Sequence, residues 1–249
     1  MVSILEAEFR KAVDIWSDIA LAIKASNRVL LWGPPGTGKS YIGTTQTSRE
    51  VFRLYLTLDT PGSEIRGHYL PSETGGFLWH DGPATRAWRT GGRLVIDEID
   101  AASGDTLTLL LGYLDDHKSA KLTLPTNEQL KPHGDFSCVA TTNQLPTTLP
   151  EALLDRFEVV LQAPLPNPAA FQDGLWHSEK LLEAAKRTVY VPTNPPPKGR
   201  GGRPIGLRNF NAIDSLVRRG LDIKDAARLV VGPEAGGALV TAMNVAKAA

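Results

Sequence analysis

The spacing of apolar residues changes along the chain, and the changes predict where helices and strands lie. Near the N-terminus apolar residues recur at steps of three and four, which predicts an amphipathic helix from Ile4 to Lys24. Short, mostly apolar runs predict five strands, at Val29–Trp32, Phe52–Leu58, Arg93–Asp97, Phe136–Thr141 and Phe157–Leu161. Helical segments are expected between them, at Lys39–Ser48, Ala84–Thr90 and Gly104–Asp115. This alternation favours an α/β fold with a largely parallel sheet.

Two segments break the alternation of strands and helices. Pro71–His80 is glycine-rich with aromatic residues, and Lys121–Gly134 has the pattern of a hairpin arm followed by a loop. Both lie where a crossover between parallel strands needs only a helix, so we interpret them as insertions.

The composition changes after Gln162, where the proline-rich run APLPNPAA predicts a boundary between a first domain, residues 1–163, and a second, residues 164–249. The second domain has helical patterning and an extended or flexible loop at Val191–Pro204. Its expected helices are Ala169–Thr188, Leu207–Arg219, Ile223–Val231 and Glu234–Ala246.

The overall charge excludes little and favours no charged partner. The 249 residues carry 27 Lys and Arg against 27 Asp and Glu, so no global field steers the chain toward nucleic acid or an anionic membrane. No uncharged apolar run reaches the ~20 residues of a membrane helix, and the first residues lack the apolar segment of a signal peptide. We therefore expect a cytoplasmic protein. The single cysteine, Cys138, allows no internal disulfide and is expected to be buried rather than a reactive thiol.

Positive charge is nevertheless concentrated locally. Between Lys180 and Arg228 there are eleven Lys and Arg against four Asp and Glu. A solvated helical face and a binding patch both account for this excess, and the first is the more common.

A phosphate-binding loop is the most specific motif in the chain. The residues GPPGTGKS fit the pattern G-x-x-x-x-G-K-[ST] at every fixed position, after an expected strand and before an expected helix. Glycines let backbone N–H groups turn toward a phosphate, and the helix adds its positive end. Lysine reaches the β- and γ-phosphates and serine binds Mg²⁺, so an ordinary glycine-rich turn is a poor alternative. The nucleotide-binding residues are Gly33, Pro34, Pro35, Gly36, Thr37, Gly38, Lys39 and Ser40.

An acid pair follows the third expected strand. The apolar run RLVI leads to Asp97 and Glu98, where Asp97 is placed to serve the metal bound by Ser40 and Glu98 to act as general base for water. Such a pair alone is often a surface strand end, but the upstream loop favours the functional interpretation. The glutamate favours hydrolysis over transfer of the phosphoryl group to another substrate.

Four further segments appear in a characteristic order. They read GGFLWHDGPATRAWRTGGRLVIDEIDAA, LLGYLDDHKSAKLTLP, CVATTN and LPEALLDRF. With the phosphate loop, they resemble an AAA+ ATPase of the MoxR-like group, close to the dynein-related ATPases, from Asn27 to Leu161. The chain departs from that group at DEIDAA, where DEINRA is usual, and at Thr142, where glutamine is common. The resemblance implies a P-loop αβα sandwich with a parallel five-stranded sheet, followed by a small helical lid.

The resemblance also implies roles for single residues. Asn143 would be sensor 1, orienting the attacking water, although TNQLP also suits a turn. Arg156 would be the arginine finger for a neighbouring subunit, unless it only pairs with Asp155 or Glu158. Arg208 would be sensor 2, with Arg203 close by as an alternative. Tyr41 joins the nucleotide-binding set, and the expected cofactors are ATP and Mg²⁺.

A finger acting in trans implies a homo-oligomeric ring, usually a hexamer, that couples ATP hydrolysis to remodelling of a client protein. A partner with a von Willebrand A domain would be a separate chain. Two alternatives stay open: a nucleic-acid-associated or restriction-type NTPase, and a scaffold that binds ATP with little turnover. The resemblance also places both insertions at the central pore, where Trp79 could grip a client or pack on its own domain, whereas Phe77 is expected to pack.

Overall fold

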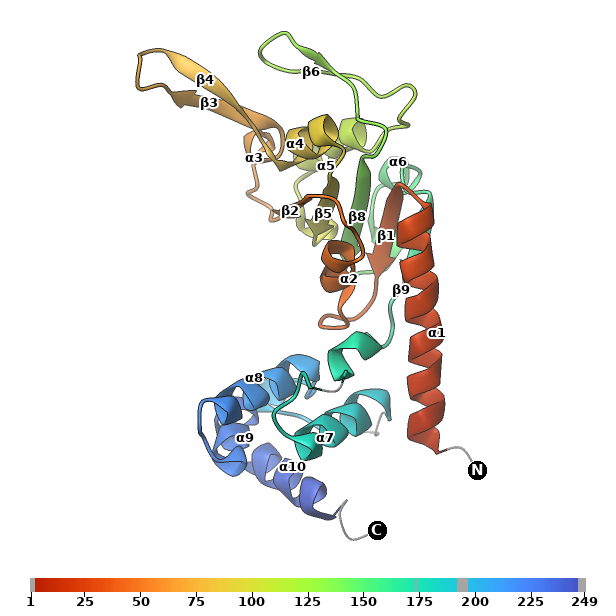
Figure 1. Ribbon diagram of the computed structural model, residues 1–249, viewed down its shortest axis with the longest axis vertical. Helices are drawn as coiled ribbons and strands as arrows, with labels where there is room; N and C mark the ends of the chain where they lie inside the picture. Colours follow the sequence, from red (N-terminus) through yellow and green to blue (C-terminus); the bar gives the residue numbers. More distant parts are fainter. Residues whose placement is uncertain (1–2, 173, 192–196, 246–249) are drawn as a thin grey trace. The chain divides into compact units, whose positions relative to one another are not determined.

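The computed structural model describes residues 3–172, 174–191 and 197–245 (Figure 1). Contacts between Cα atoms divide them into two compact units. The sheet unit comprises residues 17–35 and 39–164, and the helical unit comprises residues 3–16, 36–38 and the described residues from 165 onward. Within these residues no helix is long and apolar enough to cross a membrane.

A five-stranded parallel sheet organises the first unit, as the sequence predicts. Its strand order is β2-β5-β8-β1-β9, and every neighbouring pair is parallel. All five carboxyl ends therefore lie along one edge, which is where ligands bind in open α/β sheets. The strands are β1 (Arg28–Trp32), β2 (Val51–Tyr55), β5 (Arg93–Asp97), β8 (Ser137–Thr142) and β9 (Val159–Gln162).

Helices cover the sheet because its central strands are apolar on both faces. All residues of β5 and β8 are buried, Cys138 among them, as predicted. On one side Trp88 and Tyr113 pack edge to face, with ring centroids 5.1 Å apart. The helical segments of this unit are the second half of α1 (Ile4–Ala25), α2 (Lys39–Thr45), α3 (Gly62–Arg66), α4 (Pro83–Thr90), η1 (Ile99–Ala101), α5 (Gly104–Tyr113), η2 (Pro146–Thr148) and α6 (Glu151–Leu154).

The two insertions are hairpins that project from the same end of the sheet unit (Figure 1). In one, β3 (Gly67–Pro71) pairs antiparallel with β4 (Phe77–Asp81), and in the other β6 (Leu122–Thr123) pairs with β7 (Gln129–Leu130). The expectation that Phe77 packs on its own domain is wrong, since its side chain is 70% exposed. It lies opposite Pro71 next to the hairpin turn, beyond the reach of the core.

The helical unit is built around aromatic residues. Tyr190 packs its ring against Phe9 and Phe171, with both centroid distances 5.3 Å. The expected continuous helix Ala169–Thr188 is wrong, because a 3₁₀ turn ends at Phe171 and Gly174 adopts a left-handed φ of 82° before the helix starts. The segments are η3 (Pro168–Phe171), α7 (Glu179–Tyr190), η4 (Arg200–Gly202), α8 (Leu207–Arg218), α9 (Ile223–Val231) and α10 (Pro233–Val245).

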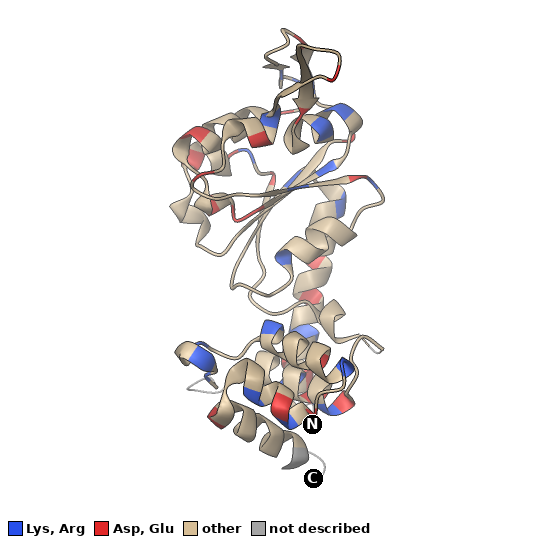
Figure 2. Cartoon of the chain, turned by 90° about the vertical axis from the view of Figure 1, so that its left-hand side faces the viewer, with Lys and Arg blue, Asp and Glu red and all other residues tan. Residues whose placement is uncertain are grey.

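Acidic residues lie among the basic ones along the chain of this unit (Figure 2). Three of the four acids between Lys180 and Arg228 form local ion pairs, which supports the interpretation of a solvated helical face. The pairs are Lys186–Glu183, Arg218–Asp214 and Arg228–Asp225, at 3.5, 2.8 and 3.3 Å. Residues 192–196 of the expected loop Val191–Pro204, and Ala246 of the last expected helix, lie outside the described residues.

Candidate nucleotide-binding site

The loop after β1 has the backbone that a phosphate cradle needs. Gly33, Gly36 and Gly38 have φ values of 141°, 80° and 105°, a region that residues with a Cβ rarely enter. A Cβ on Gly33 would lie 2.6 Å from the backbone oxygen of Ala163, which no real Cβ tolerates. The glycines at these positions are therefore required by the path of the chain itself.

Lys39, the first residue of α2, points back into the loop. It is only 6% exposed, and its Nζ donates to the backbone oxygens of Gly33 and Pro34, each at 2.8 Å. It also donates to Oδ1 of Asn143 at 2.9 Å. The structure thus joins two predicted site residues that are far apart in the sequence.

The sheet register explains how Asn143 reaches the loop. Trp32 pairs with Thr142 in the parallel ladder, and the N–H of Gly33 donates to the Thr142 oxygen at 3.3 Å. Asn143 therefore leaves β8 at the same level at which the loop leaves β1. The Asn143 side chain therefore lies beside the glycine-rich loop.

The acid pair ends the neighbouring strand β5. Asp97 is 5% exposed, and its two carboxylate oxygens have partners on the strands at either side. Oδ2 accepts from Nη2 of Arg53 on β2 at 2.8 Å, and Oδ1 accepts from the Thr141 hydroxyl on β8 at 3.2 Å. These two partners fix the orientation of the carboxylate.

Glu98 follows in a left-handed conformation, with a φ of 57° that is uncommon for a residue with a side chain. Its Oε2 accepts from the Tyr55 hydroxyl at 2.7 Å. Such strain persists only where surrounding contacts hold it, and it concentrates at functional sites. The direction of the Glu98 side chain is therefore set both by its backbone and by β2.

Sequence reasoning missed Arg53, Tyr55 and Thr141, although a signal for the first two exists. In β2 the order Phe52-Arg53-Leu54-Tyr55 alternates buried and exposed residues, so Arg53 and Tyr55 share one face. No motif marks either one, because their role comes only from the position of β2 beside β5.

The oxygen donors present suit Mg²⁺. Ser40 follows Lys39, and its hydroxyl together with the Asp97 carboxylate is the kind of ligand pair that Mg²⁺ takes alongside substrate phosphates. Among the described residues no group of three or more His, Cys, Asp or Glu could hold a metal ion.

The remaining predicted residues vary in burial. Thr37 is 4% exposed, Pro34 and Pro35 are exposed, and the Tyr41 side chain is 57% exposed. Arg208, at the start of α8, lies beside Gly36, since a Cβ on that glycine would be 3.7 Å from Cγ and Nε of the arginine. Both residues belong to the helical unit, and their roles toward a nucleotide stay predictions.

Arg156 lies after α6 and has a different partner from those considered in the sequence. Its Nη1 is 3.6 Å from Oδ1 of Asp115, rather than paired with Asp155 or Glu158. Both side chains are 39% exposed, so the pair is weak and solvent-screened. About two-fifths of the Arg156 side chain is exposed to solvent, whereas its Nε is buried.

The family described as the AAA domain (dynein-related subfamily) matches residues 28–157. Among curated proteins, YojN of Bacillus subtilis, itself uncharacterised, is 31% identical over 153 residues, which are 57% of this chain and 50% of that protein. Midasin of Dictyostelium discoideum is 32% identical over 133 residues, which are 51% of this chain and 2% of midasin. The crystal structure of NtrX from Brucella abortus in complex with ATP is 19% identical, with a TM-score of 0.52 over 89% of this chain and 53% of that one. The chain thus spans about half the length of the first of these relatives.

Proposed function

Because the chain belongs to the dynein-related subfamily of AAA domains, we propose that it hydrolyses ATP in a ring-shaped oligomer and uses the energy to remodel a client protein. A hexamer of the MoxR-like kind is the form we propose. The observation that carries the proposal is the link between Lys39 and Asn143 beside the acid pair. Lys39, Asn143 and Glu98, which we propose for charge stabilisation, water orientation and general-base catalysis, lie along one edge of the sheet.

Each residue has a step in the proposed hydrolysis. The loop N–H groups and Lys39 bind the β- and γ-phosphates, with Lys39 exchanging some of its present acceptors for phosphate oxygens. Asn143 orients the attacking water by its side-chain amide. Glu98 accepts the proton of that water, and Tyr55 holds its carboxylate in place until then.

Mg²⁺, when bound, neutralises phosphate charge and polarises the γ-phosphate. Ser40 and Asp97 would hold it, with Arg53 and Thr141 orienting Asp97 from either side.

We propose that Arg156 completes the site of a neighbouring copy. Arginine is always charged and presents a fork of donors that suits a phosphoryl-transfer transition state. Its half-exposed pairing with Asp115 holds the side chain without burying it. The ring follows from this role, because the residue would then act only in trans.

The first test is the assembly state of Glu98→Gln protein with ATP and Mg²⁺, measured by light scattering and electron microscopy. This variant should bind ATP, fail to turn it over and accumulate as a closed ring. Lys39→Ala, which should not bind nucleotide, is the matched control and should stay unassembled. A Glu98→Gln protein that remains a monomer with bound ATP would overturn the ring.

The second test separates cis from trans action. Arg156→Ala should bind ATP without hydrolysing it, and mixing it with Lys39→Ala protein should recover part of the activity at hybrid interfaces. If no mixing ratio restores activity, Arg156 does not act in trans.

The local excess of positive charge favours one second candidate, an NTPase that acts on nucleic acid. Binding of a duplex DNA to the purified protein should then fall steeply with added salt. Three of the four nearby acids are already in ion pairs with these basic residues, so we expect weak binding at most. Unchanged function in Glu98→Gln protein would instead favour an ATP-gated scaffold.

A further inference from the structure

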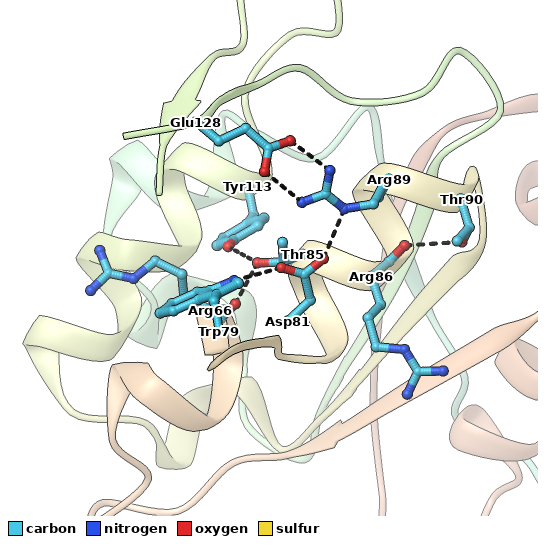
Figure 3. Close-up of polar contacts among 9 residues, drawn as sticks. All are labelled: Arg66, Trp79, Asp81, Thr85, Arg86, Arg89, Thr90, Tyr113 and Glu128. Atoms are coloured by element: carbon cyan, nitrogen blue, oxygen red, sulfur yellow. Dashed lines mark hydrogen bonds and ion pairs between the residues drawn. The ribbon is translucent and has the colours of Figure 1, made fainter. Parts of the chain in front are cut away.

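One arginine contacts both hairpins. Arg89 lies near the end of α4, and its Nε donates to Oδ2 of Asp81, the last residue of β4, at 2.8 Å. Its Nη1 and Nη2 donate to the two carboxylate oxygens of Glu128, at 2.6 and 3.0 Å. Glu128 lies in the turn that precedes β7, so a single guanidinium joins α4, the β3–β4 hairpin and the β6–β7 hairpin (Figure 3).

A second connection between the hairpins runs beside the first. The Tyr69 hydroxyl on β3 donates to the backbone oxygen of Pro125, in the β6–β7 turn, at 3.3 Å. The Tyr69 ring packs edge to face on Trp79, whose Nε1 donates to Oδ1 of Asp81 at 2.7 Å. Both carboxylate oxygens of Asp81 are therefore used, one by Arg89 and one by Trp79 (Figure 3).

The helix that carries Arg89 is fixed to the core. Trp88, the preceding residue, is fully buried, and its Nε1 donates to the Tyr113 backbone oxygen at 3.0 Å. Thr85 donates to the Arg66 backbone oxygen and is also hydrogen-bonded to the Tyr113 hydroxyl, each at 2.6 Å. Arg89 thus extends from a rigid base toward two arms that project beyond the sheet (Figures 1 and 3).

The opposite charges of Arg89 and its two carboxylate partners favour their contact in water. The same contact contributes little to the stability of the fold. The hydrogen bonds to Glu128 and Asp81 raise the pKa of Arg89. The hydrogen bond from Arg89 lowers the pKa of Glu128. Arg89 and Glu128 are each about two-fifths exposed and line an open hollow of about 620 Å³. Ion pairs this accessible contribute little to folding, so their consequence lies in where they hold the hairpins.

We propose that Arg89 is a positioning residue that fastens the β3–β4 and β6–β7 hairpins into one body on α4, so that displacement of either hairpin is transmitted to the other. Arginine suits this place because its planar fork grips one carboxylate with two donors and leaves Nε for a second acid. The fastening does not depend on the proposed ATPase function. Only its use, in which a client pulled by one hairpin also moves the other, rests on that function.

The test is the distance between spin labels on the two hairpins of the full chain without nucleotide. Cysteines introduced at the exposed positions Glu73 and Thr123 carry the labels. The native Cys138 is fully buried, and burial raises the pKa of its thiol to about 12, so it does not compete for the label. With Arg89, Asp81 and Glu128 unaltered, the doubly labelled protein should give one narrow distance distribution.

Arg89→Gln and Glu128→Gln should each lose that narrow distribution, and the double variant should be no broader than either single one. Arg89→Lys should recover only part of it, because lysine keeps the charge and loses the fork. The matched control is Arg86→Gln on the same helix, since Arg86 pairs with Glu50 and stacks over the Phe52 ring. Arg86→Gln should leave the distribution narrow, with a melting temperature close to that of Arg89→Gln.

A distribution as narrow in Arg89→Gln as in the starting protein would overturn the proposal, and so would equal broadening by Arg86→Gln. Because the measurement needs neither ATP nor a client, these results are independent of the tests of ATP hydrolysis. A protein without ATPase activity would leave the proposal for Arg89 standing. A broad distance distribution in the starting protein would leave the ATPase proposal standing.

Discussion

The nucleotide loop and the paired hairpins are held in place by different physics. The loop depends on backbone conformations that residues with a Cβ rarely adopt, and on Lys39, which is 6% exposed and donates to Gly33, Pro34 and Asn143. The hairpins depend on side chains in water, chiefly one arginine between two carboxylates. The first arrangement cannot change without loss of the site, whereas the second can change its geometry while the fold persists. The client-remodelling function that we propose would need both properties, in different places.

The largest contrast should come from the same substitution made in each region. Gly33→Ala places a Cβ 2.6 Å from the Ala163 oxygen at a φ of 141°, and should cost about 2–6 kcal/mol of the free energy of unfolding by strain and overpacking together. Gly75→Ala, in the β3–β4 turn, has a φ of 92° and no atom within 4 Å of its Cβ, so only backbone strain of about 1–3 kcal/mol applies. Urea unfolding measures both.

Equal losses of unfolding free energy in Gly33→Ala and Gly75→Ala would mean that the backbone around Gly33 shifts to accommodate a Cβ. Close backbone packing would then not be what holds the loop in its conformation. Nucleotide binding gives a second readout, since Gly33→Ala should lose it.

Substitutions of Lys39 in the loop and of Arg89 at the hairpins should differ just as clearly in their effect on ATP affinity. Lys39→Ala should lower ATP affinity about 100-fold or more, because hydrogen bonds to a charged group contribute about 1.5–3 kcal/mol each. Arg89→Ala removes a cation that lies on α4 among the hairpins, and should leave ATP affinity unchanged. Isothermal titration calorimetry compares them directly. A large loss of affinity in Arg89→Ala would show that the two regions are coupled more tightly than these contacts imply.

The regular parts of the fold could be predicted from sequence because their signals are local. Each strand of the sheet overlaps an apolar run, and α9 was predicted at Ile223–Val231, where the structure has it. The segment after Phe171 could not be predicted in this way. Its residues keep a helical pattern, but Gly174 and the Ser178 cap decide where α7 begins. Turn conformation at a single glycine overrides periodicity over a dozen residues.

For the candidate site, motifs located the residues but not their partners. Lys39, Asp97 and Asn143 follow from motif spacing, whereas Arg53 contacts Asp97 only because β2 is the neighbour of β5 in the sheet order. The ion pair of Arg156 with Asp115 was not considered either, because Asp115 is distant in sequence, and the role of Arg156 as an arginine finger stays a prediction. The order of strands in the sheet and the contacts between distant loops depend on the whole fold. A sequence pattern within one segment therefore does not predict them.

An intermediate effect is expected where a buried acid meets an exposed cation. Arg53→Gln leaves the 5% exposed Asp97 with the Thr141 hydroxyl as its remaining side-chain partner in the contacts described above, and should cost about 1–2 kcal/mol of unfolding free energy. Solvent screening keeps this cost small, because the Arg53 side chain is 60% exposed. Arg49→Gln is the control, because its pair with Asp135 is exposed on both sides and should contribute under about 1 kcal/mol. Equal losses in urea unfolding would contradict the importance of Asp97 burial.

The smallest effect is a pH dependence of the hairpins alone. The hydrogen bond from Arg89 lowers the pKa of Glu128 below its ordinary value of 4.5, although the nearby Asp81 charge opposes this. A lowered pKa in the folded state means that the Arg89–Glu128 contact contributes fully above 4.5 and is lost as the pH falls through the lowered value. The distance distribution between labels at Glu73 and Thr123 should therefore stay narrow from neutral pH down to that range and broaden below it. Glu128→Gln should be broad at every pH, and a narrow distribution that persists after Glu128 is protonated would assign the fastening to Tyr69 and Pro125 instead.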